Sequence, residues 1–204
     1  MRKIILLSFV CISSHLLAQK SFFGVDAGVN VANQRFVTIQ TPPSFNFRST
    51  VFFENSIRPA FGLFFQHNFS ELIGIRFNAQ FMGMGYTDKN QGRGSINIDY
   101  LTFPVILKYY VNKHLSLDAG TFLSFTLGGT RINNQIITKT YHENDSGLSI
   151  GGEQDIYKNF SLGVNYFIGL KNILLADTNG FGTSYKYSNR ALQFTLIYKF
   201  KKNA

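Results

Sequence analysis

The sequence predicts an all-β protein: an eight-stranded antiparallel up-and-down transmembrane β-barrel with short periplasmic turns and longer outer loops. Three observations predict this fold. Apolar and polar residues alternate over segments of nine to eleven residues, which is the length of a membrane-spanning strand. Long and short links alternate between those segments. The composition is rich in strand-forming aromatics, with 22 phenylalanines and 10 tyrosines but no tryptophan.

The alternation is strictest near the C-terminus, where Leu192, Phe194 and Leu196 are interleaved with Gln193 and Thr195. Similar period-two patterns mark the other strands, and helical periodicity does not compete with them after the N-terminal segment. The predicted strands lie at 22–32, 58–67, 71–86, 95–111, 114–127, 146–154, 160–172 and 189–200.

The links between these strands predict how the barrel is oriented. The links at 68–70, 112–113 and 155–159 are short, whereas 33–57, 87–94, 128–145 and 173–188 are longer and polar. In outer-membrane barrels the short turns face the periplasm and the long loops face outward. We therefore expect both termini on the periplasmic side and four outer loops.

The first residues are typical of a signal peptide. Arg2 and Lys3 form a basic start, an apolar stretch runs from Ile4 to Leu17, and Gln19 ends a cleavage-like segment. We expect residues 1–19 to be the signal peptide and 20–204 to be one outer-membrane β-barrel domain, exported to the outer membrane of a Gram-negative bacterium. No other segment approaches the ~18 apolar residues of a spanning helix.

Charged residues decide which strand face meets lipid. The set that opposes the apolar residues contains both signs, and charges facing hydrocarbon would each cost about 2–4 kcal/mol near the midplane. In a narrow interior, opposite charges can pair. The apolar face therefore points outward, rather than inward as in a soluble ligand-binding barrel. The expected interior charge network, which fills the lumen and closes an open pore, is Asp26, Arg76, Lys108, Asp118, Glu153, Lys171 and Lys199.

One predicted strand contains a proline, which cannot donate to a ladder and is normally confined to edges and bulges. In the segment YLTFPVILKYY at 100–110, Pro104 shares its face with Lys108, so it is expected to point inward at a bulge. The strand resembles that of the PorT-like family of small outer-membrane β-barrels. The matching residues are Tyr100, Leu101, Pro104, Lys108 and Tyr109.

The resemblance continues in the next strand, which begins Leu115-Ser116-Leu117, and in the first two strands, around Phe23-Gly24-Val25 and Pro59-Ala60-Phe61. It covers essentially the whole mature chain. Thr102 departs from the acidic residue common in that family. The resemblance implies an eight-stranded outer-membrane barrel. A named member serves in type IX protein secretion, although a shared fold does not transfer that role.

Among candidate sites, the segment YHENDS at 141–146 contains the residue types of a nucleophilic site, with His142 and Ser146. No nucleophile motif surrounds Ser146, so a hydrated loop is the better interpretation. His67 and His114 lack the spacing of metal ligands. We therefore expect no enzymatic activity, no metal and no cofactor.

The expected role is structural or interaction-based, as a surface barrel or a subunit of an envelope or type IX-like secretion assembly. The alternatives are a narrow porin-like channel and an outer-membrane enzyme using residues near His142. Expected partners are outer-membrane lipid, the barrel-insertion machinery and envelope proteins. Nucleic acid is not expected, because the basic residues behind the net charge of +9 are scattered. Aromatic residues near both strand ends predict two interfacial belts. The periplasmic belt is expected to comprise Phe22, Phe65, Phe69, Tyr109, Tyr110, Tyr157, Phe160, Tyr198 and Phe200, and the outer belt Tyr86, Phe125, Tyr185 and Tyr187.

Overall fold

The computed structural model describes residues 21–40, 47–88, 94–132, 135–137, 142–173, 178–179 and 183–200. Eight long strands form the barrel. They are β1 (Ser21–Gln40), β3 (Ser56–Asn68), β4 (Ile73–Asp88), β5 (Gly94–Tyr110), β6 (Leu115–Ile132), β8 (Asn144–Tyr157), β9 (Phe160–Gly169) and β11 (Thr183–Phe200). Three short strands, β2 (Phe47–Phe52), β7 (Gln135–Ile137) and β10 (Thr178–Asn179), extend it at one end. Among these described residues, no helix is long and apolar enough to cross a membrane.

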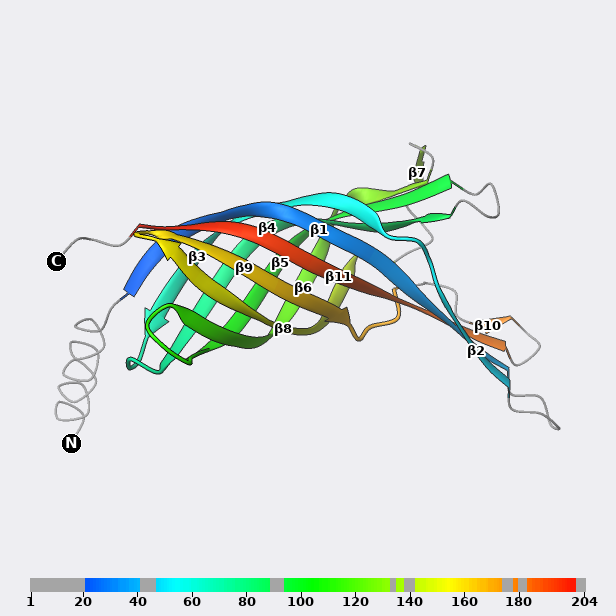
Figure 1. The fold of residues 1–204 in the computed structure, drawn as a ribbon. Coiled ribbons are helices and arrows are strands. Elements are labelled where there is room, and N and C mark those ends of the chain that lie inside the picture. Colours follow the sequence, from blue (N-terminus) through cyan, green and yellow to red (C-terminus); the bar gives the residue numbers. More distant parts are fainter. Residues whose placement is uncertain are drawn as a thin grey trace, which may run out of the picture.

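The barrel closes where the first strand meets the last. β1 pairs antiparallel with β11 from Phe23↔Phe200 to Gln40↔Thr183, and on its other side with β3. Every neighbouring pair around the ring is antiparallel. Figure 1 shows β1 and β11 side by side along the whole wall. The predicted fold class, a closed eight-stranded antiparallel barrel, is confirmed.

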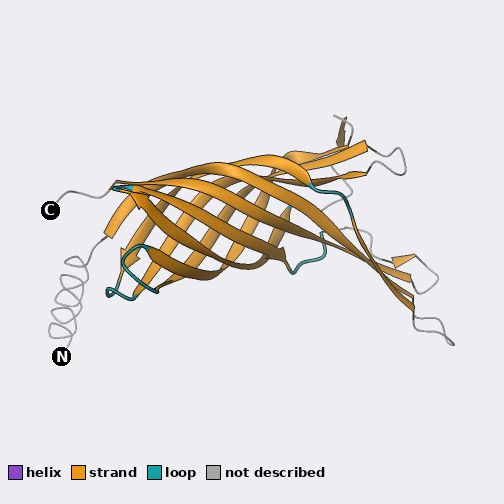
Figure 2. Ribbon diagram, viewed as in Figure 1, coloured by secondary structure: helices purple, strands orange, loops and turns teal. Residues whose placement is uncertain are grey.

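Several strands are longer than the alternation predicted, and most of the extra length lies at one end. Residues 33–40, 128–132 and 183–188 were expected in loops but belong to β1, β6 and β11. Beyond the barrel wall the strands form two projections, one from β1, β2, β10 and β11 and one from β4, β5, β6 and β7 (Figure 1). The short turns lie at the opposite end, near the start of β1 and the end of β11 (Figure 2). Backbone pairing therefore continues well past the apolar alternation.

Alternate residues along each strand face the lumen or the outside. Along β9 the side chains alternate between buried and accessible positions from Phe160 to Gly169. The accessible set is apolar, including Leu63 at 64% exposure, Leu123 at 57% and Leu196 at 48%. Apolar side chains also point outward on the other barrel strands, for example Phe23, Phe77, Phe103, Leu117, Ile150 and Leu162. An apolar outer girdle around a polar and packed interior is the arrangement of a transmembrane barrel.

Pro104 is buried on the lumen face of β5, but the predicted bulge at this residue is wrong. Pairing of β5 with β4 stops after Phe77↔Val105 and resumes in the same register at Gln80↔Thr102. Pairing with β6 continues through Pro104↔Phe122. The chain therefore tolerates the missing N–H by a local gap in one ladder, without slipping the register.

Glycine is required at Gly85 in β4, where φ is +140° and an added Cβ would lie 1.9 Å from the carbonyl oxygen of Ile96. Gly128 in β6 also has a positive φ, +78°, but an added Cβ there would meet no atom within 4 Å. We expect Gly85→Ala to lower the free energy of unfolding by about 2 kcal/mol. Gly128→Ala, which adds backbone strain without the clash, should lower it by about 1 kcal/mol.

The unfolding midpoint in urea, read for both variants from lipid vesicles, measures this difference. Equal losses at the two glycines would show that close approach to Ile96 contributes nothing.

Candidate functional site: the barrel interior

A buried ion-pair cluster fills the lumen at the turn end of the barrel. Its centre is the Glu153 carboxylate on β8, which is approached by three cations from three other strands. Arg76 on β4 lies 2.7 Å from Oε2, Lys108 on β5 lies 3.0 Å from the same oxygen, and Lys199 on β11 lies 2.6 Å from Oε1. Each of these four side chains is at most 5% exposed. We call this set, with the acids described next, the ion-pair cluster.

Two further carboxylates complete the ion-pair cluster. The Lys108 ammonium donates to both oxygens of Asp118 on β6, at 2.8 and 2.7 Å. Asp118 also accepts from the Ser116 hydroxyl at 2.9 Å. The Lys199 ammonium contacts Asp155 at the end of β8. Three cations thus face three carboxylates, so the buried charges compensate one another, as a low-dielectric interior requires.

Neutral groups hold the Arg76 guanidinium in place. Its Nε and Nη2 both donate to the amide oxygen of Gln66, at 2.9 and 2.7 Å. The guanidinium carbon lies 4.1 Å from the centroid of the Phe64 ring, a cation–π geometry. Gln66 in turn donates to the Tyr110 hydroxyl. The arginine is therefore fixed by a carboxylate, an amide and an aromatic face together.

Two residues of the sequence-predicted network lie outside this cluster. Asp26 is buried in the lumen, where its Oδ2 accepts from the Asn78 amide at 3.4 Å rather than from a cation. Lys171 lies near the opposite end, after β9, and its ammonium contacts the side-chain oxygen of Asn144. The structure thus brings together Arg76, Lys108, Asp118, Glu153 and Lys199, and it does not bring Lys171 to them.

Sequence reasoning missed one charged member of the cluster. Asp155 is in phase with Glu153, two residues earlier, but was assigned to a turn because the predicted strand ended at Gln154. The structure extends β8 to Tyr157, with a register shift between Asp155 and Tyr157. Ser161 then donates to Asp155 at 2.6 Å. The period-two phase of the acids was the signal that could have found Asp155.

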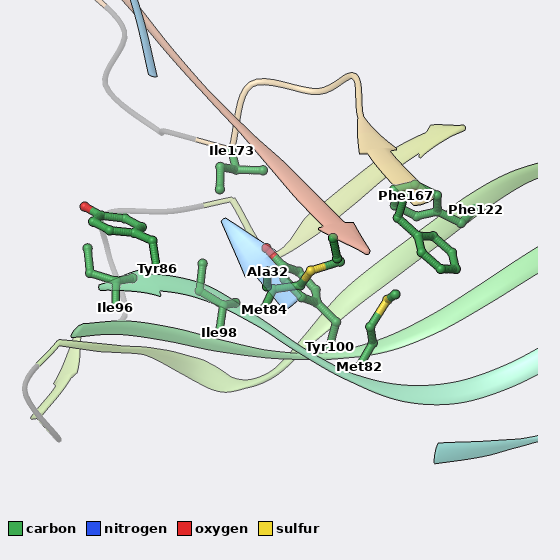
Figure 3. Packing of buried hydrophobic residues seen from close by; sticks show 11 residues of the cluster. Ala32, Met82, Met84, Tyr86, Ile96, Ile98, Tyr100, Phe122, Phe167 and Ile173 are labelled. Atoms are coloured by element: carbon green, nitrogen blue, oxygen red, sulfur yellow. The ribbon is translucent and has the colours of Figure 1, made fainter. Parts of the chain in front are cut away.

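Apolar side chains fill the lumen toward the projecting end. Figure 3 shows Met82 and Met84 from β4 packing with Ile98 and Tyr100 from β5. The buried cluster comprises Ala32, Met82, Met84, Tyr86, Ile96, Ile98, Tyr100, Phe122, Phe167, Ile173 and Ala191. Phe53 and Tyr187 pack against it, with the Phe53 and Tyr86 rings stacked 4.0 Å apart. The expectation of a wholly polar interior is therefore wrong for this half, which is closed by apolar packing.

A layer of hydrogen-bonded polar groups joins the two halves. Asn189 on β11 donates to the Tyr100 hydroxyl at 3.2 Å and to Asp145 Oδ2 at 2.9 Å, and it accepts from Gln34 at 2.9 Å. Thr102 and Ser124 share a hydrogen bond of 2.9 Å across β5 and β6. Thr102, which stands where an acidic residue was expected from the family resemblance, is thus paired with a neutral partner.

The five residues of the family-like strand motif divide between the two faces of β5. Tyr100, Pro104 and Lys108 are buried in the lumen, whereas Tyr109 is 52% exposed and Leu101 is partly exposed on the outer face. Tyr100 belongs to the buried apolar cluster, and Lys108 belongs to the ion-pair cluster. The motif therefore links both halves of the interior through one strand.

The predicted aromatic belts are only partly correct. Phe200, Tyr157 and Tyr109 are exposed near the turn end, as expected for interfacial side chains. Phe22, however, is buried against Phe64 in the lumen. At the projecting end, Tyr86 and Tyr187 belong to or contact the apolar cluster, and Tyr185 stacks on Phe36. Phe125 is outward at 48% exposure, and Phe65, Phe69, Phe160 and Tyr198 are at least partly accessible at the turn end.

The residues of the candidate nucleophilic site do not converge. Asp145 points into the lumen toward Asn189, while the following residue, Ser146, is partly exposed on the other face of β8. The backbone N–H of His142 donates to the carbonyl of Ile173 at 2.7 Å. Tyr141 lies outside the described residues. Within the described ranges, no group of three or more histidines, cysteines or acids could hold a metal ion.

These features define a class of protein: a closed eight-stranded outer-membrane β-barrel whose lumen is filled by its own side chains. Residues 17–175 match the outer membrane protein beta-barrel domain family, and the chain belongs to this family. No curated protein matches the sequence.

Two solved structures are similar to this chain. Neisserial surface protein A (NspA) is 12% identical, with a TM-score of 0.55 over 87% of this chain and 97% of that chain. The outer membrane protein OprG from Pseudomonas aeruginosa is 13% identical, with a TM-score of 0.49 over 90% of this chain and 98% of that chain. At these identities the likeness of NspA indicates fold alone.

Proposed function

We propose that this protein is a non-enzymatic outer-membrane barrel of the PorT-like subgroup with a structural or interaction role. Its projecting strands would contact envelope proteins, such as those of a type IX-like secretion assembly. The observation that supports this most is the filled lumen, with an ion-pair cluster at one end and apolar packing at the other. Because the interior side chains pack against one another, the projections are the surface that remains for binding a partner.

Export by a cleaved signal peptide at 1–19 and insertion by the barrel-insertion machinery belong to the same proposal. The predicted signal peptide lies outside the described residues. N-terminal sequencing of the protein recovered from membranes tests it, and the expected first residue is Lys20. An intact N-terminus on the folded, membrane-inserted protein would contradict cleavage.

The membrane location is tested by fractionation and by migration on SDS gels. A closed barrel resists the detergent until heated, so we expect the unheated protein to migrate faster than the boiled protein and to partition with the outer membrane. A protein that stays soluble and shows no shift would exclude the proposal.

The interaction role is tested by trimming one projection. Phe36 of β1 pairs directly with Val51 of β2, so residues 37–50 can be replaced by Asn-Gly to form a tight hairpin at that point. We expect the trimmed barrel to fold, to retain its gel shift, and to lose a partner that co-purifies with the wild type.

The matched control shortens the other side of the barrel. Thr87 of β4 pairs with Ser95 of β5, so residues 88–94 can be replaced by the same two residues. That variant should keep a partner that binds the β1–β2 projection. If the wild type captures no envelope protein after cross-linking in intact cells, the interaction role fails.

One observation favours the narrow porin-like channel as a second candidate. In the described part of the chain, Asp26 Oδ1, Asn78 Oδ1 and Asn165 Oδ1 are buried without a hydrogen-bond partner. Buried polar atoms of this kind are commonly satisfied by water. Steady single-channel conductance in planar bilayers, altered by Lys108→Glu or Asp118→Lys, would favour this candidate. A silent bilayer favours the filled barrel.

A further inference from the structure

Four basic residues gather on the outward face of the sheet that β1, β2 and β11 form beyond the apolar girdle. They are Arg35, Arg48, Lys186 and Arg190, which we call the basic patch. Lys186 and Arg48 are exposed, and Arg35 and Arg190 are partly exposed.

The strand register places these four residues on one face. Val37 pairs with Lys186 on β11 and with Thr50 on β2, while Asn33 pairs with Arg190. Arg35 is two residues from each of those β1 positions and therefore shares their face. The face comprises Asn33, Arg35, Val37, Arg48, Thr50, Lys186, Ser188 and Arg190 among the positions whose side chains are described, and of these Val37 and Ser188 are buried. It carries four cations and no acid.

The patch begins where the lipid-facing span of β1 ends. Phe23 is 63% exposed and Val29 is 44% exposed on the same outward face, and Val31 follows. A barrel strand crosses the hydrocarbon in about 9–11 residues. Arg35 and, on the neighbouring strand, Arg190 therefore lie at headgroup depth. Lys186 and Arg48 lie farther out.

The opposite face of the same strands is aromatic instead of basic. The Phe36 ring lies 4.6 Å from the Tyr187 ring and 5.8 Å from the Tyr185 ring. Phe36 pairs with Tyr187 between the pairs that carry the cations. The positive charge is thus confined to the side that faces the outer leaflet, and the side that continues the lumen lacks it.

The side chains have the chemistry of an anion site. The Arg190 guanidinium donates to the Tyr166 hydroxyl at 3.3 Å, which holds it against the barrel wall. Arg35 Nε is buried and has no acceptor among the described residues. Arginine presents several donors in a rigid fork that fits phosphate oxygens.

We propose that the basic patch binds the phosphate groups of the anionic glycolipid in the outer leaflet. Arg35 and Arg190 contact phosphates at headgroup depth, and Lys186 and Arg48 contact phosphates of the sugar region beyond. The inference requires the barrel to sit in the outer membrane but does not depend on any protein partner of the projections.

The test uses the full-length mature barrel in detergent micelles and counts bound lipid by native mass spectrometry. The probes are lipid A with both phosphates and the same lipid after phosphate removal. The variant is Arg35→Gln/Arg190→Gln, which removes the two cations placed at headgroup depth. Its control, Lys113→Gln/Lys158→Gln, removes two exposed cations from the short turns at the other end of the barrel. Retention of the heat-dependent gel shift verifies folding of both.

Each basic side chain near an anionic surface contributes about fivefold in affinity, so the double variant should bind phosphorylated lipid A about 25-fold more weakly. The control variant should bind like the wild type, and the dephosphorylated lipid should bind poorly to all three. Equal loss in both variants, or tight binding of the dephosphorylated lipid, would overturn the proposal. Displacement of the lipid by soluble dextran sulfate at equal charge would instead assign the patch to a soluble polyanion.

Discussion

Replacing Glu153 by glutamine is expected to lower the free energy of unfolding by about 3–5 kcal/mol, the range for removing one partner of a buried ion pair. The substitution keeps the shape of the side chain but removes the charge that three cations share. Arg76, Lys108 and Lys199 would then face only Asp118 and Asp155. The excess positive charge would then remain in the lumen, where these side chains are almost fully shielded from water.

The measurement is unfolding by urea from lipid vesicles, with the folded fraction read from the gel shift because the protein has no tryptophan. Glu143→Gln is the matched control, since Glu143 is exposed next to β8 and should change stability by less than about 0.5 kcal/mol. Equal stability of the two variants would mean that the ion-pair cluster does not hold the strands together.

The sequence predicts which face of each strand points outward, but it does not predict the full length of the strands. Period-two alternation of apolar residues ends where the membrane ends, because only lipid imposes it. Beyond that point β1 and β11 stay paired through Val37↔Lys186 to Gln40↔Thr183. Those residues are mostly polar, so their pattern resembles a polar loop. Hydrogen bonding between the backbones of neighbouring strands leaves no periodic side-chain pattern, so periodicity cannot predict it.

The interior illustrates the same limit for side chains. Glu153 and Lys108 could be placed in the lumen because a charge on the other face would meet lipid. The pairing of Glu153 with Arg76 and Lys199 depends on how β4, β8 and β11 face one another across the lumen, which strand order alone does not specify. Lys171 satisfied the same sequence criterion but lies beyond β9, near Asn144.

The apolar half of the lumen was missed for a different reason. On β4, the same lumen-facing positions of the two-residue repeat that hold Arg76 and Gln80 also hold Met82, Met84 and Tyr86. The repeat therefore places these three apolar side chains in the lumen. Apolar residues at strand ends were instead interpreted as interfacial or lipid-facing. In a narrow barrel, apolar side chains can fill the interior as well as cover the exterior. Only the position of a residue in the two-residue repeat of its strand shows which of the two faces it lies on.

The second large effect is expected on the outer face, where Ile150→Arg should lower the free energy of unfolding by about 2–4 kcal/mol. Ile150 is 60% exposed at the middle of β8, where it pairs with Ala119 and Tyr166 of the two neighbouring strands. An arginine there would have to place its guanidinium in hydrocarbon or bend it toward a distant interface. The urea midpoint in lipid vesicles measures the loss.

Ile156→Arg is the matched comparison, because Ile156 is the same residue type on the same strand, 52% exposed, and next to the turn at Lys158 and Asn159. At the interface the arginine head reaches water, so the expected loss is about 0–1 kcal/mol. A larger loss at Ile156 than at Ile150 would contradict the depth assignment. If both variants were as stable as the wild type in vesicles, the face with Ile150 would not contact lipid, and the apolar girdle would have to be buried against another protein.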